Sequence, residues 1–109
     1  SKDQIIPLEV DEVLFFIRRR WGVSYDLRLL TKGKRLYLQI MWRFLEQQSF
    51  PLNESDYCEN LAYVIEVINR LGKAAEVRAW LSTVEGEPKI GRALSLPLRV
   101  EEMLGEFVI

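Results

Sequence analysis

Hydrophobic and polar residues alternate with two different periods along this chain, and the change of period predicts where helices give way to strands. From Leu8 to Trp21 the apolar residues recur every three or four positions, as on one face of an amphipathic helix. Gly22 follows directly, and glycine readily takes the left-handed conformation that ends many helices. We therefore predict a first helix over 8–21, with Phe15 on its charged side and outside the apolar stripe.

Residues 25–44 alternate between apolar and other side chains, and a short polar stretch with Gly33 interrupts them as the tip of a hairpin. We expect Lys32 and Gly33 to be the two loop residues. This register gives three cross-strand pairs on one face: Leu29–Leu36, Leu27–Leu38 and Tyr25–Ile40. A slip of one residue would set Arg28 against Leu38, so it is disfavoured.

The second strand of this hairpin carries large side chains on both faces. One row is apolar and predicts burial in the core: Leu36, Leu38, Ile40, Trp42 and Phe44. The opposite row is polar with large flat or flexible groups, beside Asp26 and Arg28 of the first strand: Arg35, Tyr37, Gln39, Met41 and Arg43. The polar row is neither a second core nor an ordinary solvated surface.

Two further helices and one strand follow. Asn53 or Ser55 can cap a helix that runs to about Leu71, and a shorter helix covers about 73–83. The stretch ALSLPLRV alternates cleanly as a strand, and Pro97 places it at a sheet edge because proline cannot donate to a ladder. The tail 101–109 fits either a short helix or an extended segment.

The predicted order of elements is α-β-β-α-α-β. Since every strand has one strongly apolar face, the economical fold is α+β: a small, mainly antiparallel three-stranded sheet with helices packed on one face. We expect one globular domain over residues 1–109, with an ordered core at about 8–100 and an N-terminal tail at 1–6.

Composition narrows the possible chemistry. The chain has 109 residues, 49% of them hydrophobic and 28% charged, which is typical of a globular domain. It has no histidine, so nucleophiles activated by imidazole are excluded, and its single Cys58 cannot build a zinc site or an intramolecular disulfide. No apolar run approaches the roughly 18 residues of a membrane-spanning helix. We predict no enzymatic activity, no cofactor and no bound metal.

Charge is distributed unevenly although the net charge is only −1. Residues 18–43 contain one acid, Asp26, and eight basic residues: Arg18, Arg19, Arg20, Arg28, Lys32, Lys34, Arg35 and Arg43. A local surplus of this kind attracts an anionic partner even when the whole protein is nearly neutral. The alternative is that the arginines complement a helix dipole and the lysines solvate a turn.

The stretches RRRWGVSYDLRL, RLYLQIMWRFLEQQSFPL, VRAWL and RALSLPL resemble a small uncharacterised family of cyanobacteria and plastid-bearing eukaryotes, a domain of unknown function. The resemblance runs from about Val10 to Leu98. It implies a protein of the cyanobacterial cytoplasm or the plastid stroma, and it brings no assigned activity, cofactor or catalytic residue. This setting suggests photosynthesis-related assembly or regulation.

The candidate binding residues fall in two groups. Arginine, tyrosine and methionine are favoured at protein interfaces, and the outer sheet face combines them. The sheet group comprises Arg28, Arg35, Tyr37, Met41 and Arg43, and Phe15, Arg18 and Arg19 of the first helix add a second basic group with an exposed aromatic. We predict a non-enzymatic protein-binding or assembly module that docks an acidic protein partner.

Two other functions remain open from the sequence. Basic residues interleaved with aromatics on a sheet can stack the bases of single-stranded RNA or DNA, although the pI of about 5.5 lies below the basic range typical of such domains. A small-molecule enzyme would have to use Asp26, Arg28 or Tyr37 as acid or base groups. The sequence does not determine the oligomeric state.

Overall fold

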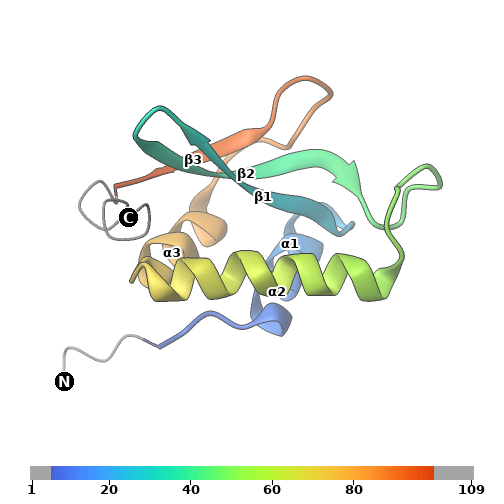
Figure 1. Cartoon of the computed structure of the whole chain (residues 1–109). Helices are drawn as coiled ribbons and strands as arrows, with labels where there is room; N and C mark the ends of the chain where they lie inside the picture. The colour runs from blue at the N-terminus through green and yellow to red at the C-terminus, as the bar shows by residue number, and fades with distance from the viewer. Residues whose placement is uncertain (1–5, 100–109) are drawn as a thin grey trace.

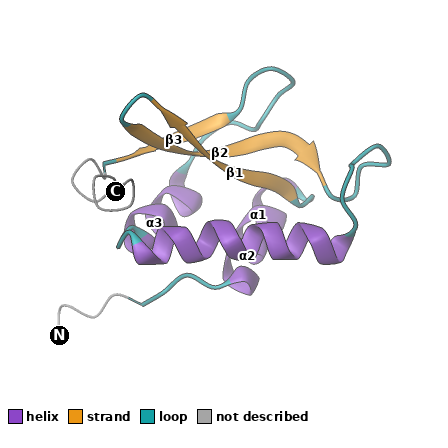
Figure 2. Cartoon of the chain, in the orientation of Figure 1, coloured by secondary structure: helices purple, strands orange, loops and turns teal. Residues whose placement is uncertain are grey.

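The computed structural model describes residues 6–99, which form a layer of helices beneath a three-stranded antiparallel sheet (Figures 1 and 2). Along the chain the elements are α1 (Val10–Trp21), β1 (Tyr25–Lys32), β2 (Arg35–Phe44), α2 (Glu54–Arg70), α3 (Ala74–Thr83) and β3 (Leu94–Leu98). The sheet order is β1-β2-β3. The α+β class, the order of elements and the single helical layer are as predicted, whereas the tails 1–5 and 100–109 lie outside the described residues.

Local signals determine the ends of these elements. Gly22 ends α1 with a φ of 81°, and its N–H donates to the Arg18 carbonyl at 2.8 Å. Asn53 caps α2, where its Oδ1 accepts from the Asp56 N–H at 2.8 Å. Pro97 lies in the edge strand β3, as its missing N–H predicts.

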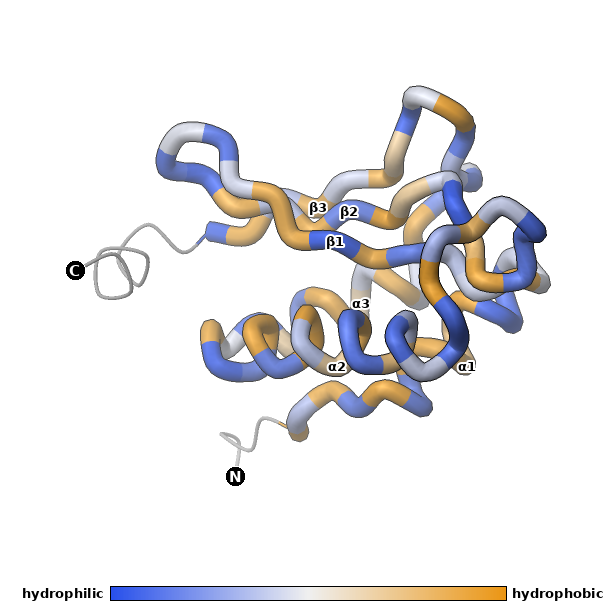
Figure 3. The backbone as a smooth tube through the Cα atoms, turned by 45° about the vertical axis from the view of Figure 1, so that its right-hand side comes forward, coloured by the Kyte–Doolittle hydropathy of each residue, from blue (hydrophilic) through white to orange (hydrophobic). Residues whose placement is uncertain are grey.

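The core lies between the inner face of the sheet and the three helices. Leu36, Leu38 and Ile40 of the middle strand are buried there. The helices supply Ile17 from α1, Ile65 and Ile68 from α2, and Val77 and Leu81 from α3, all buried. In Figure 3 the hairpin tip is strongly hydrophilic, while apolar positions recur along the strands. Burial of each large aliphatic side chain contributes about 1.5–3 kcal/mol.

The register of the hairpin differs from the prediction. Leu29 lies opposite Leu38, and Leu27 lies opposite Ile40, so the pairing is displaced by two residues. The loop is Gly33-Lys34, and Gly33 has a φ of 64° at its first position, the place where a type II′ turn takes glycine. Because side chains alternate with a period of two, this displacement leaves the residues of the regular pairing, from Leu27 to Ile40, on their predicted faces.

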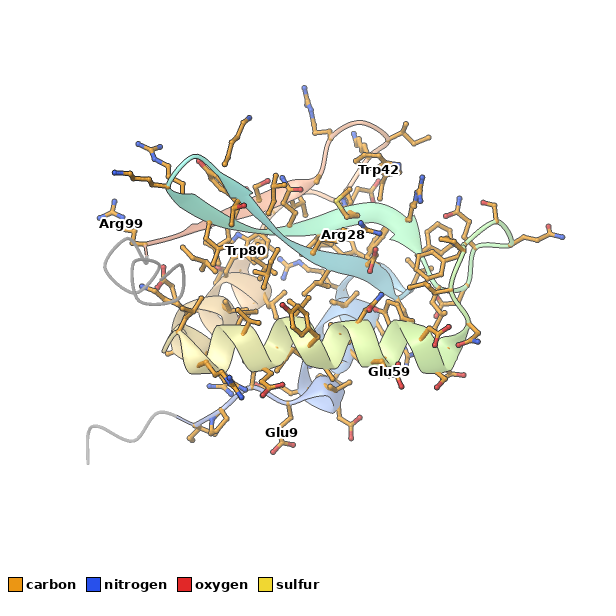
Figure 4. All side chains as sticks on the ribbon, in the orientation of Figure 1. Glu9, Arg28, Trp42, Glu59, Trp80 and Arg99 are labelled. Carbon is orange, nitrogen blue, oxygen red and sulfur yellow. The ribbon has the colours of Figure 1, made fainter. Side chains whose placement is uncertain are left out.

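The position of Trp42 also differs from the prediction. Beyond Ile40 the register shifts, so that Tyr25 faces Phe44 and residues 41–43 bulge opposite Asp26. Alternation fails in this bulge. Trp42 is only half-buried and is not part of the core cluster, and Figure 4 shows it on the side of the sheet away from the helices.

The other two tryptophans are half-buried and pack against the core, close to the prediction. Trp80 lies between the sheet and α3 in Figure 4. Trp21 donates from Nε1 to the Gly86 carbonyl at 3.0 Å and meets the Tyr25 ring edge-on at 5.7 Å. Tyr25 in turn meets Phe44 edge-on at 5.8 Å, which joins the end of α1 to the end of β2.

These positions predict an order of mutational cost. Leu38→Ala removes a fully buried side chain from the middle strand, so it should lower the free energy of unfolding by ~2–5 kcal/mol. Trp42→Ala should cost clearly less, because this larger side chain lies outside the core cluster. Chemical denaturation of both variants checks the order, and an equal or greater loss for Trp42→Ala would contradict the outward position of the indole.

Candidate functional site: the outer face of the sheet

The outer face of the sheet is the face that none of the helices within residues 6–99 covers (Figure 1). Strand pairing arranges its residues in rows across the three strands: Arg28–Gln39–Ser95, then Leu30–Tyr37–Pro97, then Lys32–Arg35 at the hairpin tip. Gln39 Nε2 donates to Ser95 Oγ at 3.0 Å, which ties β2 to the edge strand. The helices within residues 6–99 therefore leave the predicted sheet group uncovered.

The positive charge on this face is less uniform than the sequence suggested. Asp26 is only 5% exposed, and its Oδ2 accepts from Arg28 Nε at 3.0 Å. The positive charge of Arg28 is thus neutralised by Asp26, which lies on the same strand. Arg35 and Arg43 are exposed and form no ion pair with another residue of the described range 6–99. These two arginines, with Lys32 and Lys34 at the hairpin tip, carry the free positive charge.

A small hollow of about 190 Å³ opens on this face beside the bulge. Its lining is formed by Asp26, Arg28, Met41, Trp42 and Arg43. The hollow combines the Arg43 guanidinium, which has no ion-pair partner among residues 6–99, with a flexible thioether and a flat indole. Trp42 is a candidate contact that sequence reasoning missed, because strict alternation assigned it to the core.

The connection between α3 and β3 adds a second feature that sequence reasoning missed. Figure 1 shows this loop rising on the outer side of the sheet. Lys89 and Arg92 bond to each other through both backbone N–H groups, at 3.0 and 2.7 Å, and Gly91 has a φ of 77°. Ile90 at the tip is 89% exposed. The signal was present as Lys-Ile-Gly-Arg, a turn glycine with basic residues on both sides.

The residues of α1 do not join this surface. Phe15, Arg18 and Arg19 belong to the helical layer, on the other side of the sheet. The Arg19 guanidinium lies 5.7 Å from the centre of the Phe15 ring, a cation–π contact within one helix turn. Arg18 Nε donates to Ser24 Oγ at 2.7 Å, so it has a structural partner. The candidate residues therefore form two separate surfaces.

Hydrogen bonds between the buried Ser24 and the exposed Glu46 form a polar joint at the end of the hairpin that carries the bulge. The Ser24 N–H and hydroxyl both donate to the Glu46 carboxylate at 2.8 Å, and the Leu45 N–H donates to the Ser24 carbonyl at 2.9 Å. Desolvation raises the pKa of Glu46, but the hydrogen bonds from Ser24, a backbone hydrogen bond of Glu46 itself and the positive charge of Arg18 together leave this pKa lowered. The joint fixes the chain immediately after the bulge.

Tyr57 of α2 holds the same region from below. Its hydroxyl donates to the Tyr25 carbonyl at 2.8 Å. Burial, together with the negative charge of Asp26, raises the pKa of Tyr57, so the phenol stays protonated and remains a donor. The bulged end of the sheet is thereby held by two sets of hydrogen bonds, those between Ser24 and Glu46 and the one from Tyr57 to Tyr25.

The side chains gathered on the outer face are suited to binding. Over residues 6–99, no three His, Cys, Asp or Glu side chains lie close enough together to hold a metal ion. Within the same range no helix has the length and apolar character to cross a membrane. What the outer face offers is free guanidinium groups beside tyrosine, methionine and tryptophan.

Fold and site together define a small α+β protein with one sheet face left bare and positively charged. The family described as "Domain of unknown function (DUF3067)" matches residues 11–108, and this chain belongs to that family. The match confirms the resemblance found in the sequence. Among proteins with curated descriptions, no significant match was found.

A solved structure supports the fold independently. The solution NMR structure of the Alr2454 protein from the cyanobacterium Nostoc sp. strain PCC 7120 is similar, with a TM-score of 0.81. The two sequences are 34% identical, and the alignment covers 94% of this chain and 98% of that one. The cyanobacterial side of the resemblance is thereby supported.

The Glu46 joint predicts a dependence of stability on pH. Because the pKa of Glu46 is lowered in the folded protein, the ionised carboxylate stabilises the fold. This stabilisation is fully present above pH 4.5, the ordinary pKa of the group, and is lost as the pH falls through the lower pKa of the folded state. Glu46→Gln should therefore reduce the free energy of unfolding at pH 7, and the difference from the parent should shrink below pH 4.5. Denaturation at several pH values measures this, and a constant difference would contradict it.

Proposed function

We propose that this protein is a non-enzymatic binding module whose outer sheet face docks an acidic protein partner. The observation that carries the proposal is the pair of exposed arginines, Arg35 and Arg43, on a face that the protein's own helices leave bare. Near them, Tyr37, Met41 and Trp42 are half-buried and offer the apolar contact area typical of interface centres.

Charge and contact area play different parts in this docking. Free guanidinium groups steer an acidic partner and pair with its carboxylates, often through two parallel hydrogen bonds. Aromatic and thioether groups then supply most of the contact that holds the complex. The hollow beside Trp42 and Arg43 is suited to receive an acidic side chain of the partner.

We further propose that the partner belongs to a photosynthetic complex or to its assembly, in the cyanobacterial cytoplasm or the plastid stroma. The cyanobacterial source of the similar Alr2454 structure supports this setting. No catalytic role is proposed. Asp26, the carboxylate of the enzyme alternative, is buried and already paired with Arg28.

Charge reversal tests the docking surface directly. Arg35→Glu combined with Arg43→Glu should abolish capture of the acidic partner from a cyanobacterial lysate, while the melting temperature stays within a few degrees of the parent. Both side chains are exposed and lack an internal ion pair within residues 6–99, so their loss should not disturb the fold. Capture by the parent should weaken as salt rises, because the Debye length is only ~8 Å at 0.15 M. Mass spectrometry of the captured proteins provides the readout.

A matched control carries the same change of charge elsewhere. Arg19→Glu with Arg70→Glu alters two exposed arginines of the helical layer, so it should leave capture intact. Loss of capture in this control alone would move the site to the helices. A labelled single-stranded oligonucleotide tested in parallel separates the RNA or DNA alternative, since binding to it, with no protein captured, would overturn the proposal.

A further inference from the structure

The sheet has two edge strands, β1 and β3, and strand pairing decides which backbone groups each edge presents. The hairpin turn is closed by hydrogen bonds between Lys32 and Arg35. Along an antiparallel strand, residues bonded to the neighbouring strand alternate with residues whose N–H and C=O groups point the other way. The backbone groups of Leu27, Leu29 and Thr31 therefore point away from β2, where no further strand lies within residues 6–99.

Two observations agree with this assignment. The Tyr25 carbonyl, which belongs to the same outward set, accepts from the Tyr57 hydroxyl of α2. In β3 the same alternation points the backbone of Pro97 away from β2, the position in which proline removes no ladder bond. The edge of β3 is therefore blunted by a proline, whereas β1 contains none and keeps its donors.

The helix α2, which runs beneath β1, covers part of this edge (Figure 1). Leu27 is only 3% exposed, so its backbone is enclosed. Leu29 is half-buried and Thr31 is exposed. Outside the strand ladders, no hydrogen bond from another residue of the range 6–99 reaches the backbone of Leu29 or Thr31. The open part of the edge is therefore the stretch from Leu29 to Thr31.

A groove follows the open edge between β1 and α2. It has a narrow part of about 230 Å³ and a wide part of about 670 Å³, and both parts are lined by Leu29 and Tyr63. Tyr63 is 66% exposed and stands where the two parts meet. The wide part has further apolar walls on both sides: Leu36 from the sheet, and Val67 and Leu71 from the end of α2. Glu66 and Arg70 also line it, but they pair with each other at 2.9 Å.

An extended segment fits this edge in both backbone and side chains. A strand added ~4.8 Å from β1 can bond to the outward groups of Leu29 and Thr31. Every second side chain of that strand then enters the groove, which favours apolar residues. The side chains between them lie on the outer face beside Lys32, which is exposed and has no ion-pair partner within residues 6–99. Cross-strand charge pairing favours acids at these positions.

A second copy of β1 fits the same edge less well. Its one carboxylate, Asp26, is buried and paired with Arg28, so it offers no free acid to Lys32. Lysine on an edge strand also protects a sheet against pairing with its own copies. The charge of the edge therefore favours a different, acidic segment.

We propose that the edge of β1 from Leu29 to Thr31 binds an extended partner segment in which apolar and acidic residues alternate. The segment adds to the sheet as an antiparallel strand, with its apolar side chains in the groove beside α2 and its acids beside Lys32. This binding uses the backbone of β1, whereas the docking proposed above uses the side chains of Arg35 and Arg43. Either proposal can therefore fail without the other.

Amide hydrogen exchange of the full-length protein, followed by NMR, tests this edge with a synthetic peptide that alternates valine and glutamate. Without the peptide, the amide of Leu30, which is bonded to Tyr37, should exchange slowly, and those of Leu29 and Thr31 should exchange fast. Saturation with the peptide should slow the latter two at least about tenfold. A peptide that alternates valine and lysine should bind about two- to fivefold more weakly, because it sets like charges beside Lys32.

Three results would overturn the proposal. The first is slow exchange of Leu29 and Thr31 before any peptide is added, since the edge would then already be paired. The second is a dimer of the free protein that forms through β1. The third is a peptide response confined to Met41 and Arg43, which would leave docking on the outer face standing.

A pair of variants at one position separates the backbone from the side chain. Thr31→Pro removes the outward N–H without breaking a ladder bond, so it should weaken binding of the valine–glutamate peptide about tenfold. Thr31→Val keeps this N–H and should leave the affinity within about twofold of the parent. Equal affinities of the two variants would contradict backbone pairing.

N-methylated peptides make the same test without changing the protein. In an antiparallel added strand, the valines lie opposite Leu29 and Thr31, so their N–H groups face β1 and those of the glutamates face away. Methylation of the valine nitrogens should abolish binding, whereas methylation of the glutamate nitrogens should preserve it. Equal binding of the two methylated peptides would overturn the proposal.

Discussion

The middle strand β2 has only one face that is apolar without interruption, and burying that face decides where the helices can lie. Burial beneath the helices stabilises the fold by about 1.5–3 kcal/mol for each of three side chains, Leu36, Leu38 and Ile40. A helix on the opposite face would instead have to desolvate Arg35 and Arg43 without partners, which costs more than the apolar contacts return. All three helices therefore lie beneath the sheet, and the outer face remains available to other molecules.

The same face shows why a count of basic residues overstates an electrostatic site. Asp26 and Arg28 form an ion pair in which the carboxylate is buried. A pair of this kind fixes the positions of its two side chains, but it leaves little net charge to attract a partner. Any long-range steering of a partner would come from Arg35 and Arg43, which have no ion-pair partner within residues 6–99. Since those charges are exposed, their effect is modest and screened by salt, which suits a reversible partner more than a permanent subunit.

The outer face and a groove on the inner side of the sheet, lined by Leu29, Leu36 and Val67 among others, offer different chemistry on opposite sides of one hairpin. The outer face is cationic with a few large contact groups, whereas the groove is mainly apolar and lies beside the core. The β1–β2 hairpin is shared by both.

The sequence by itself determined the elements, their order and the face on which most side chains lie. These properties follow from local periods, caps and turn residues, as Gly22, Asn53 and Pro97 show. It also placed Arg28, Arg35 and Tyr37 on the outer face of the sheet, because a displacement by two residues does not change a side chain's face. Only the tertiary structure decided the register, the bulge at 41–43 and the outward position of Trp42. The physical reason is that both registers satisfy the alternation equally well, and the choice depends on the turn conformation at Gly33 and on the Ser24–Glu46 joint between distant residues.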